Sequence, residues 1–173
     1  SSAAAVIPGD LLGPEWRVIS AGGLEIAANW KIVTEGVLEG YHIRATHPES
    51  FYPRQYDNLN LVEPFGRRNT RVTYPFQNIE RQGGTPAAER TTRRVLTHLY
   101  HLFPNAAVAP FPTHRVLTIF EPLAPDRMVN VSYNLTDRLI DVAQEREAVK
   151  QGADFVSVGV EEDRAVQCAV QRG

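Results

Sequence analysis

The chain has 173 residues, with 18 lysine or arginine residues against 20 aspartate or glutamate residues, and a formal net charge of −2. This length suits one domain with a single hydrophobic core, and the mixed charge excludes a basic face for nucleic acid. No apolar run approaches the roughly 18–20 residues that cross a bilayer. Residues 1–5 lack the basic start of a signal peptide, so we expect a cytoplasmic protein.

The first half of the chain is expected to combine short strands with one helix. Gly22-Gly23 predicts a turn between strands at residues 16–20 and 24–27. A helix over residues 29–42 is predicted because apolar side chains recur there with a 3.6-residue period. Residues 48–69 are rich in proline, asparagine, tyrosine and arginine and show no period, which indicates an irregular excursion.

The second half carries the clearest strand signals. The expected elements are a strand at residues 71–77, a helix at 89–103, strands at 106–109, 116–121 and 128–135, and helices at 137–151 and 161–172. Arg90, Arg93 and Arg94 would lie on one solvated face of the 89–103 helix. Successive strands joined by short turns must pair antiparallel. The pattern therefore predicts an α+β fold in which an antiparallel sheet packs on a C-terminal helix.

Two histidines and a carboxylate lie close together near the end of the first expected helix. Glu39, His42 and His47 fall within nine residues, and such a group can form a metal site or an acid–base site. Five positions correspond to about 140° around an ideal helix, so the histidines can share an ion only if the helix ends or distorts between them. Pro48 favours such an end, because the residue before a proline avoids the helical region. Two unrelated histidines at a helix end are the alternative.

Asp163 is the candidate for a third ligand. The helix expected at residues 161–172 carries an apolar stripe that includes Val166 and Val170, and Asp163 falls on this stripe. A buried carboxylate is costly unless it is paired, hydrogen-bonded or bound to a metal. Alternatively, the three acids at residues 161–163 lie in the first helical turn and favour the helix dipole.

Five motifs occur along the chain in a specific order. They are Asn29-Trp30-Lys31, then Glu39-Gly40-Tyr41-His42 with His47, then Leu102-Phe103-Pro104-Asn105, then Pro122-Leu123-Ala124-Pro125-Asp126-Arg127, and finally Glu162-Asp163 followed after seven residues by Gln171-Arg172-Gly173. Each motif is modest alone. Together they resemble the catalytic domain of the Rieske non-haem iron oxygenase α-subunits, the ring-hydroxylating oxygenases.

The resemblance implies a helix-grip (START-like) fold in which residues 1–173 form a single catalytic domain. His42, His47 and Asp163 would hold a mononuclear Fe(II), and Glu39 would couple this iron to a neighbouring electron donor. The implied reaction is O2-dependent hydroxylation, by mono- or dioxygenation, of a small aromatic or other organic substrate. The implied partners are a reductase or ferredoxin and further copies of the chain, in a homotrimer or an α3β3 assembly.

Two positions depart from the family pattern. Many members have asparagine where Gly36 stands, so any role of that amide is missing from this chain. Glu39 replaces the more usual aspartate, which lengthens the tether of the carboxylate by one methylene.

The single cysteine limits the cofactors that this chain can hold. A Rieske [2Fe–2S] cluster needs two cysteines and two histidines, whereas the chain contains only Cys168, which is expected to be a packing residue. The cluster is therefore expected in a further domain, N-terminal to this chain. His98 and His101 form only a weak candidate for a second metal site.

Two other functions fit parts of the pattern. A helix-grip domain can bind a small hydrophobic ligand without catalysis, but it would have no reason to bring His42, His47 and Asp163 together. A zinc hydrolase could use the same three ligands with Glu39 as general base. The Asn29-Trp30-Lys31 motif and the motif at the end of the chain argue against the hydrolase.

Overall fold

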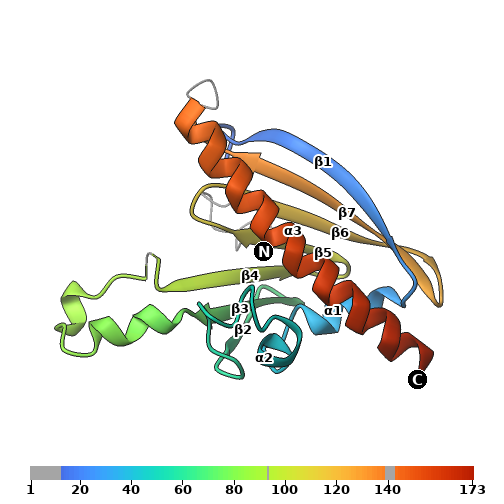
Figure 1. Cartoon of the computed structure of the whole chain (residues 1–173), viewed down its shortest axis with the longest axis horizontal. Helices are drawn as coiled ribbons and strands as arrows, with labels where there is room; N and C mark the ends of the chain where they lie inside the picture. The colour runs from blue at the N-terminus through green and yellow to red at the C-terminus, as the bar shows by residue number, and fades with distance from the viewer. Residues whose placement is uncertain (1–12, 93, 139–142) are drawn as a thin grey trace.

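The computed structural model of the chain describes residues 13–92, 94–138 and 143–173 (Figure 1). Its elements in chain order are β1 (Arg17–Ile26), α1 (Trp30–Gly36), α2 (Ile43–Thr46), β2 (Leu61–Phe65), β3 (Asn69–Pro75), η2 (Gln77–Gln82), η3 (Ala87–Glu89), β4 (Leu96–Leu102), β5 (Ala106–Pro110), β6 (Arg115–Ala124), β7 (Arg127–Thr136) and α3 (Ala143–Arg172). None of the described helices is both long enough and apolar enough to cross a bilayer.

One antiparallel sheet of seven strands, in the order β1-β7-β6-β5-β4-β3-β2, forms the body of the domain. The long helix α3 runs diagonally across the sheet, and α1 lies beside the C-terminal part of α3 (Figure 1). The predicted turn at Pro125-Asp126 joins β6 to β7. The expected α+β, helix-grip architecture is therefore confirmed.

β1 corrects the strand pair that was expected around Gly22-Gly23. It is one strand, in which Gly22 pairs with Ser132 and Gly23 with Val131 of β7. Neither glycine has the positive φ that a tight hairpin turn requires. The long-range ladder with β7 replaces the local hairpin.

The prediction that residues 48–69 form an irregular excursion is wrong for residues 61–65. Residues 61–65 form β2, which pairs with β3 through a turn where Gly66 has a φ of 59°. A positive φ is easily adopted by glycine, which has no Cβ. β2 is an edge strand, and its proline at position 64 is of a kind tolerated there.

The prediction of a helix at residues 89–103 is also wrong, because Leu96–Leu102 form the strand β4. Tyr100 pairs with Arg71 of β3 on one side and with Val108 of β5 on the other. Hydrogen bonding on both edges outweighs the weak helical spacing of the leucines. Arg90 and Arg94 consequently lie outside any helix, and the remaining arginine of the expected face, Arg93, lies outside the described residues.

At the C-terminus, one helix replaces the two that were expected. α3 continues through the residues that were expected to separate them, including Gly152 and Gly159. A Cβ added at Gly152 would lie 3.0 Å from Cε1 of His114, and one added at Gly159 would collide with the Phe51 ring. These glycines therefore allow close approach rather than ending the helix. Residues 139–142 of the helix expected from position 137 lie outside the described residues.

The main hydrophobic core lies where α1, the sheet and the C-terminal part of α3 meet. Its buried members are Ile26, Ala28, Val33, Ala107, Phe120 and Met128. Trp30 of α1 and Cys168 of α3 pack against this cluster. Cys168 is thus confirmed as a packing residue.

We predict that Gly159→Ala destabilises the protein although alanine favours helices by about 1 kcal/mol. The new methyl group would have to displace Phe51, and overpacking of this kind costs about 1–3 kcal/mol. Gly36→Ala in α1 is the matched control, because a Cβ there would meet only an ordinary contact at 3.8 Å from Gln167. Thermal unfolding should show a lower Tm for Gly159→Ala alone. A higher Tm for this variant would contradict the packing argument.

Candidate metal centre

The segment between α1 and α2 presents the first two candidate ligands. α1 ends at Gly36, so Glu39 lies in the following turn rather than within a helix over residues 29–42 as expected. His42 and His47 cap the two ends of the single-turn helix α2. The chain thus breaks its helix between α1 and α2 and again at His47, directly before Pro48.

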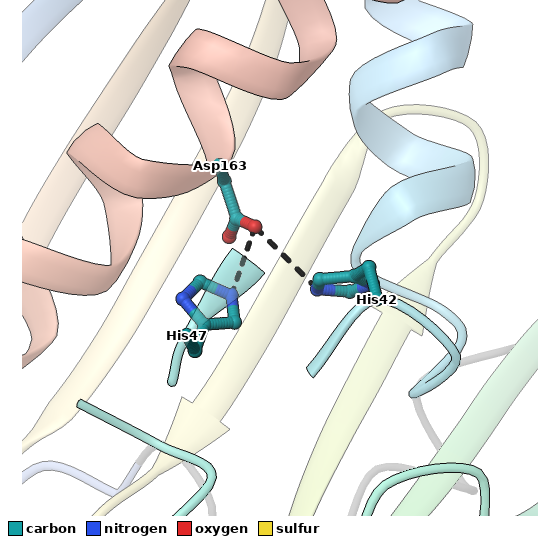
Figure 2. A group of neighbouring side chains, drawn as sticks. All are labelled: His42, His47 and Asp163. Carbon is teal, nitrogen blue, oxygen red and sulfur yellow. Dashed lines mark ion pairs between the residues drawn. The ribbon is translucent and has the colours of Figure 1, made fainter. Parts of the chain in front are cut away.

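The three candidate ligands converge. Asp163 Oδ1 lies 3.0 Å from Nε2 of His47 and 3.4 Å from Nε2 of His42. One ligand atom from each residue lies within 4.8 Å of the others. In Figure 2 the carboxylate of Asp163 reaches down from α3 between the two imidazole rings. Within the described ranges this is the only group of three or more histidine, cysteine or acidic side chains so arranged.

Asp163 reaches this position from the middle of α3, and this corrects two expectations. The acids at residues 161–163 do not lie in a first helical turn, because α3 already includes Ala143. The stripe formed by Val166 and Val170 is not buried, since these side chains are 43% and 58% exposed. The inward face instead contains Gly159, Asp163 and Gln167.

The chemistry of His47 fits a cation. Its side chain is fully buried, and Nε2 makes no hydrogen bond of acceptable geometry although Asp163 lies close. Burial alone would lower the pKa of His47, but the carboxylates of Asp163 and Glu162 outweigh burial and raise it. Two carboxylates next to one imidazole favour a positive charge at that position. A divalent cation at Nε2 would supply that charge and a partner for the nitrogen.

Each histidine also has a glutamate on its other nitrogen. His42 Nδ1 contacts Glu39, whose second oxygen accepts from the backbone N–H of Tyr41. His47 Nδ1 lies 2.7 Å from Glu162 Oε2, which also accepts from Ser50 Oγ at 2.5 Å. Carboxylates in this position fix the tautomer and the ring orientation of metal-binding histidines. Both rings therefore present Nε2 toward Asp163.

Glu162 was not assigned a role from the sequence. It belongs to the motif at the end of the chain, and it was otherwise interpreted only as a helix-start acid. Adjacent helix positions differ by about 100°, yet both side chains reach His47, one at each ring nitrogen.

Tyr74 of β3 holds the turn that carries Glu39. Its hydroxyl donates to the backbone carbonyl of Val37 at 2.7 Å. Burial is the main cause that raises the pKa of Tyr74, and the negative charges of Glu39 and Asp163 raise this pKa further. The hydroxyl therefore keeps its proton and acts as a donor.

Asn29 connects three of the sequence motifs at the base of the site. Its side chain caps α1 by accepting from Lys31 N at 2.9 Å and donates to the carbonyl of Pro125 at 2.6 Å. Its backbone N–H donates to Gln171 Oε1 at 2.7 Å. These bonds fix the C-terminal end of α3 against α1 and so set the position from which Asp163 reaches the histidines.

A large cavity of about 1520 Å³ opens between α3 and the sheet and includes the candidate metal centre in its wall. Phe51 lines it beside His47, with ring centroids 4.7 Å apart, and packs on Phe155 of α3 at 5.2 Å. Pockets that bind small molecules are mostly apolar with a few placed polar groups. The arrangement can thus hold an organic ligand next to a metal.

The other histidine pair does not form a metal site. His98 and His101 lie three positions apart on β4, so they point to opposite faces of the sheet. His98 Nδ1 lies 2.9 Å from Thr73 Oγ1, and His101 Nε2 lies 3.2 Å from the carbonyl of Pro104.

Comparison with known proteins bears on the same residues. Residues 13–173 match the family described as ring hydroxylating alpha subunit (catalytic domain). No curated protein matches the sequence. The match includes every residue of the candidate metal centre.

Three solved structures have a similar fold. The quaternary ammonium Rieske monooxygenase CntA has 15% identity and a TM-score of 0.70, with 95% of this chain and 42% of that chain covered. Dicamba monooxygenase has 14% identity and a TM-score of 0.61, with 99% and 54% covered. Naphthalene 1,2-dioxygenase from Rhodococcus sp. has 15% identity and a TM-score of 0.59, with 91% and 44% covered. The chain thus spans about half, or less, of the length of these proteins.

We predict that the chain binds about one equivalent of Fe(II) and that His47→Ala abolishes binding, because two histidines and one carboxylate are the usual ligand set of such iron sites. Metal analysis after anaerobic loading and desalting measures the stoichiometry. His98→Ala is the control and should keep its iron, since His98 is not one of the three converging ligands and its Nδ1 lies 2.9 Å from Thr73 Oγ1. Full retention of iron by His47→Ala would refute the ligand assignment.

Glu162→Ala should weaken Fe(II) binding by about 10–100-fold, because loss of the carboxylate frees the orientation of the His47 ring. Competition with a chelator of known affinity gives the dissociation constant. The control is Glu161→Ala, because Glu161 is exposed and pairs with Arg164 at 3.1 Å. Equal affinities of wild type and Glu162→Ala would show that this contact does not support the site.

Proposed function

Because the chain belongs to the ring hydroxylating alpha subunit (catalytic domain) family, we propose that it is the catalytic domain of an O2-dependent oxygenase. It hydroxylates a small organic substrate at a mononuclear Fe(II), with electrons from a Rieske [2Fe–2S] cluster. The convergence of His42, His47 and Asp163 on one point in a cavity wall carries this proposal. The cluster belongs to a domain N-terminal to residues 1–173, in a cytoplasmic assembly of several chains served by a reductase or ferredoxin.

The roles of the side chains around the candidate metal centre follow from their positions. His42, His47 and Asp163 would hold a cation and would leave room beside it for substrate and O2. Fe(II), when bound, supplies the electron-transfer chemistry that O2 requires. Phe51 and Phe155 provide an apolar wall beside His47, which favours an organic substrate over water. Glu162 fixes the orientation of the His47 ring through its contact with Nδ1.

Glu39 is proposed to serve electron delivery. It contacts His42 on the nitrogen that faces away from Asp163, and its side chain is 41% exposed. Tyr41, two residues on, is 75% exposed. A carboxylate that touches a ligand on one side and the surface on the other can connect the iron to a cluster on a neighbouring subunit, as the family resemblance implies for a ring of three chains.

The two alternative functions receive less support. A carrier of hydrophobic ligands has no use for the orienting glutamates behind both histidines. A zinc hydrolase needs Glu39 to approach a metal-bound water. Both oxygens of Glu39 are instead engaged, by His42 and by the backbone of Tyr41.

In the intact protein, Glu39→Gln should keep its iron but lose steady-state turnover by about 10–100-fold. The Rieske cluster should still accept electrons from the reductase, and onward transfer to the iron should stall. Rapid-mixing spectroscopy of the cluster with metal analysis separates these steps. Glu35→Gln, on the exposed side of α1, is the control. Loss of iron in Glu39→Gln would make this residue a ligand, and normal turnover would make it a bystander.

Residues 1–173 alone should show neither the visible absorption nor the EPR signal of a Rieske centre, because Cys168 is their only cysteine. They should also fail to turn over with a reductase. A [2Fe–2S] signal from this polypeptide by itself would contradict the proposed division of cofactors.

A further inference from the structure

The wall of the cavity is unexpectedly polar along β7. Asn130, Ser132 and Asn134 alternate along the strand, point to the same face and line the cavity. Met128, two residues before Asn130 on the same face, belongs to the hydrophobic core. Polar side chains thus begin where the core ends and the cavity begins.

Asn130 stands out because its amide is both buried and hydrogen-bonded to a neighbour on the same strand. It is only 9% exposed, and its neighbours across the two strand pairs are Leu24 of β1 and Phe120 of β6. Its Oδ1 accepts from Ser132 Oγ at 3.1 Å. In this orientation the amide nitrogen lies on the side of the amide away from Ser132.

The two N–H groups of Asn130 are unused. Among the described residues, Nδ2 has no hydrogen-bond partner, and it is not among the enclosed unpaired atoms, so it opens onto the cavity. Asn134 differs, because its Nδ2 donates to Ser20 Oγ at 2.9 Å. The cavity wall along β7 therefore presents the amide donor of Asn130 beside the apolar side chain of Leu24.

We propose that Asn130 is a substrate-recognition residue and that the substrate is a largely apolar organic compound bearing a hydrogen-bond acceptor oxygen, rather than an unsubstituted hydrocarbon. The proposal rests on the oxygenase function proposed above. A ligand that fills the cavity removes water from Nδ2. Without an acceptor it leaves a buried donor unpaired, which costs more than the bond itself contributes.

The test is the affinity of the intact, Fe(II)-loaded protein for matched aromatic pairs under anaerobic conditions. The probes are acetophenone against ethylbenzene and benzoate against toluene, with dissociation constants from ligand-observed NMR titration. We expect the oxygen-bearing member of at least one pair to bind about tenfold tighter or more. Preference for acetophenone identifies a neutral acceptor, and preference for benzoate identifies a carboxylate.

Variants at two positions of β7 distinguish a loss of ligand recognition from a loss of folding. Asn130→Leu should remove the preference, whereas Asn134→Leu should keep it because the Asn134 amide is already bonded to Ser20. Asn130→Asp keeps the shape but replaces donors by an acceptor, so it should weaken acetophenone and benzoate binding even if Asn130→Leu fails to fold.

Three results would each overturn the inference. They are equal affinities within both pairs, no binding of any probe to iron-loaded wild type, and an unchanged preference in Asn130→Leu or in Asn130→Asp. Iron content measured on the same samples distinguishes the two proposals. Absence of iron counts against the oxygenase function, and iron without a preference counts only against the role of Asn130.

Discussion

The position of one carboxylate between two imidazoles constrains most of this structure. Asp163 lies in the middle of α3, and it can meet His42 and His47 only if this helix crosses the sheet at a set height and rotation. Asn29 and Gln171 fix the C-terminal end of the helix, and Gly159 lets it approach Phe51. His47, buried and with Nε2 lacking a hydrogen bond, makes the arrangement costly without a positive charge. A cation between these three side chains would supply that charge.

Each histidine is held by a carboxylate at the ring nitrogen that faces away from Asp163. Glu162 and Ser50 hold His47, whose ring lies against Phe51 in the cavity wall. Glu39 contacts His42, lines the same cavity and is 41% exposed. Under the proposed function, substrate would enter this cavity, and Glu39 would connect the iron to the surface of the protein.

How far the sequence predicts this molecule depends on the range of the interactions involved. Spacing and Pro48 made His42 and His47 candidates, and the resemblance of the ordered motifs to the oxygenase family assigned them as ligands together with Asp163. The local argument that placed Asp163 on a buried stripe was wrong, because Val166 and Val170 are exposed. Local arguments also placed a helix over β4, whose pairing with β3 and β5 cannot be read from its own residues. Glu162 and Asn130 were missed for a related reason. Their roles depend on contacts with His47 and with the cavity, which exist only once α3 lies across the sheet.

The most direct test of the central claim is a crystal structure of the Fe(II)-loaded protein with diffraction measured on both sides of the iron absorption edge. We expect one anomalous peak per chain, within bonding distance of the Nε2 atoms of His42 and His47 and of a carboxylate oxygen of Asp163. Glu39 and Glu162 should stay on the Nδ1 atoms. A peak bonded through Nδ1, a peak at another position, or no peak at full iron loading would contradict the claim.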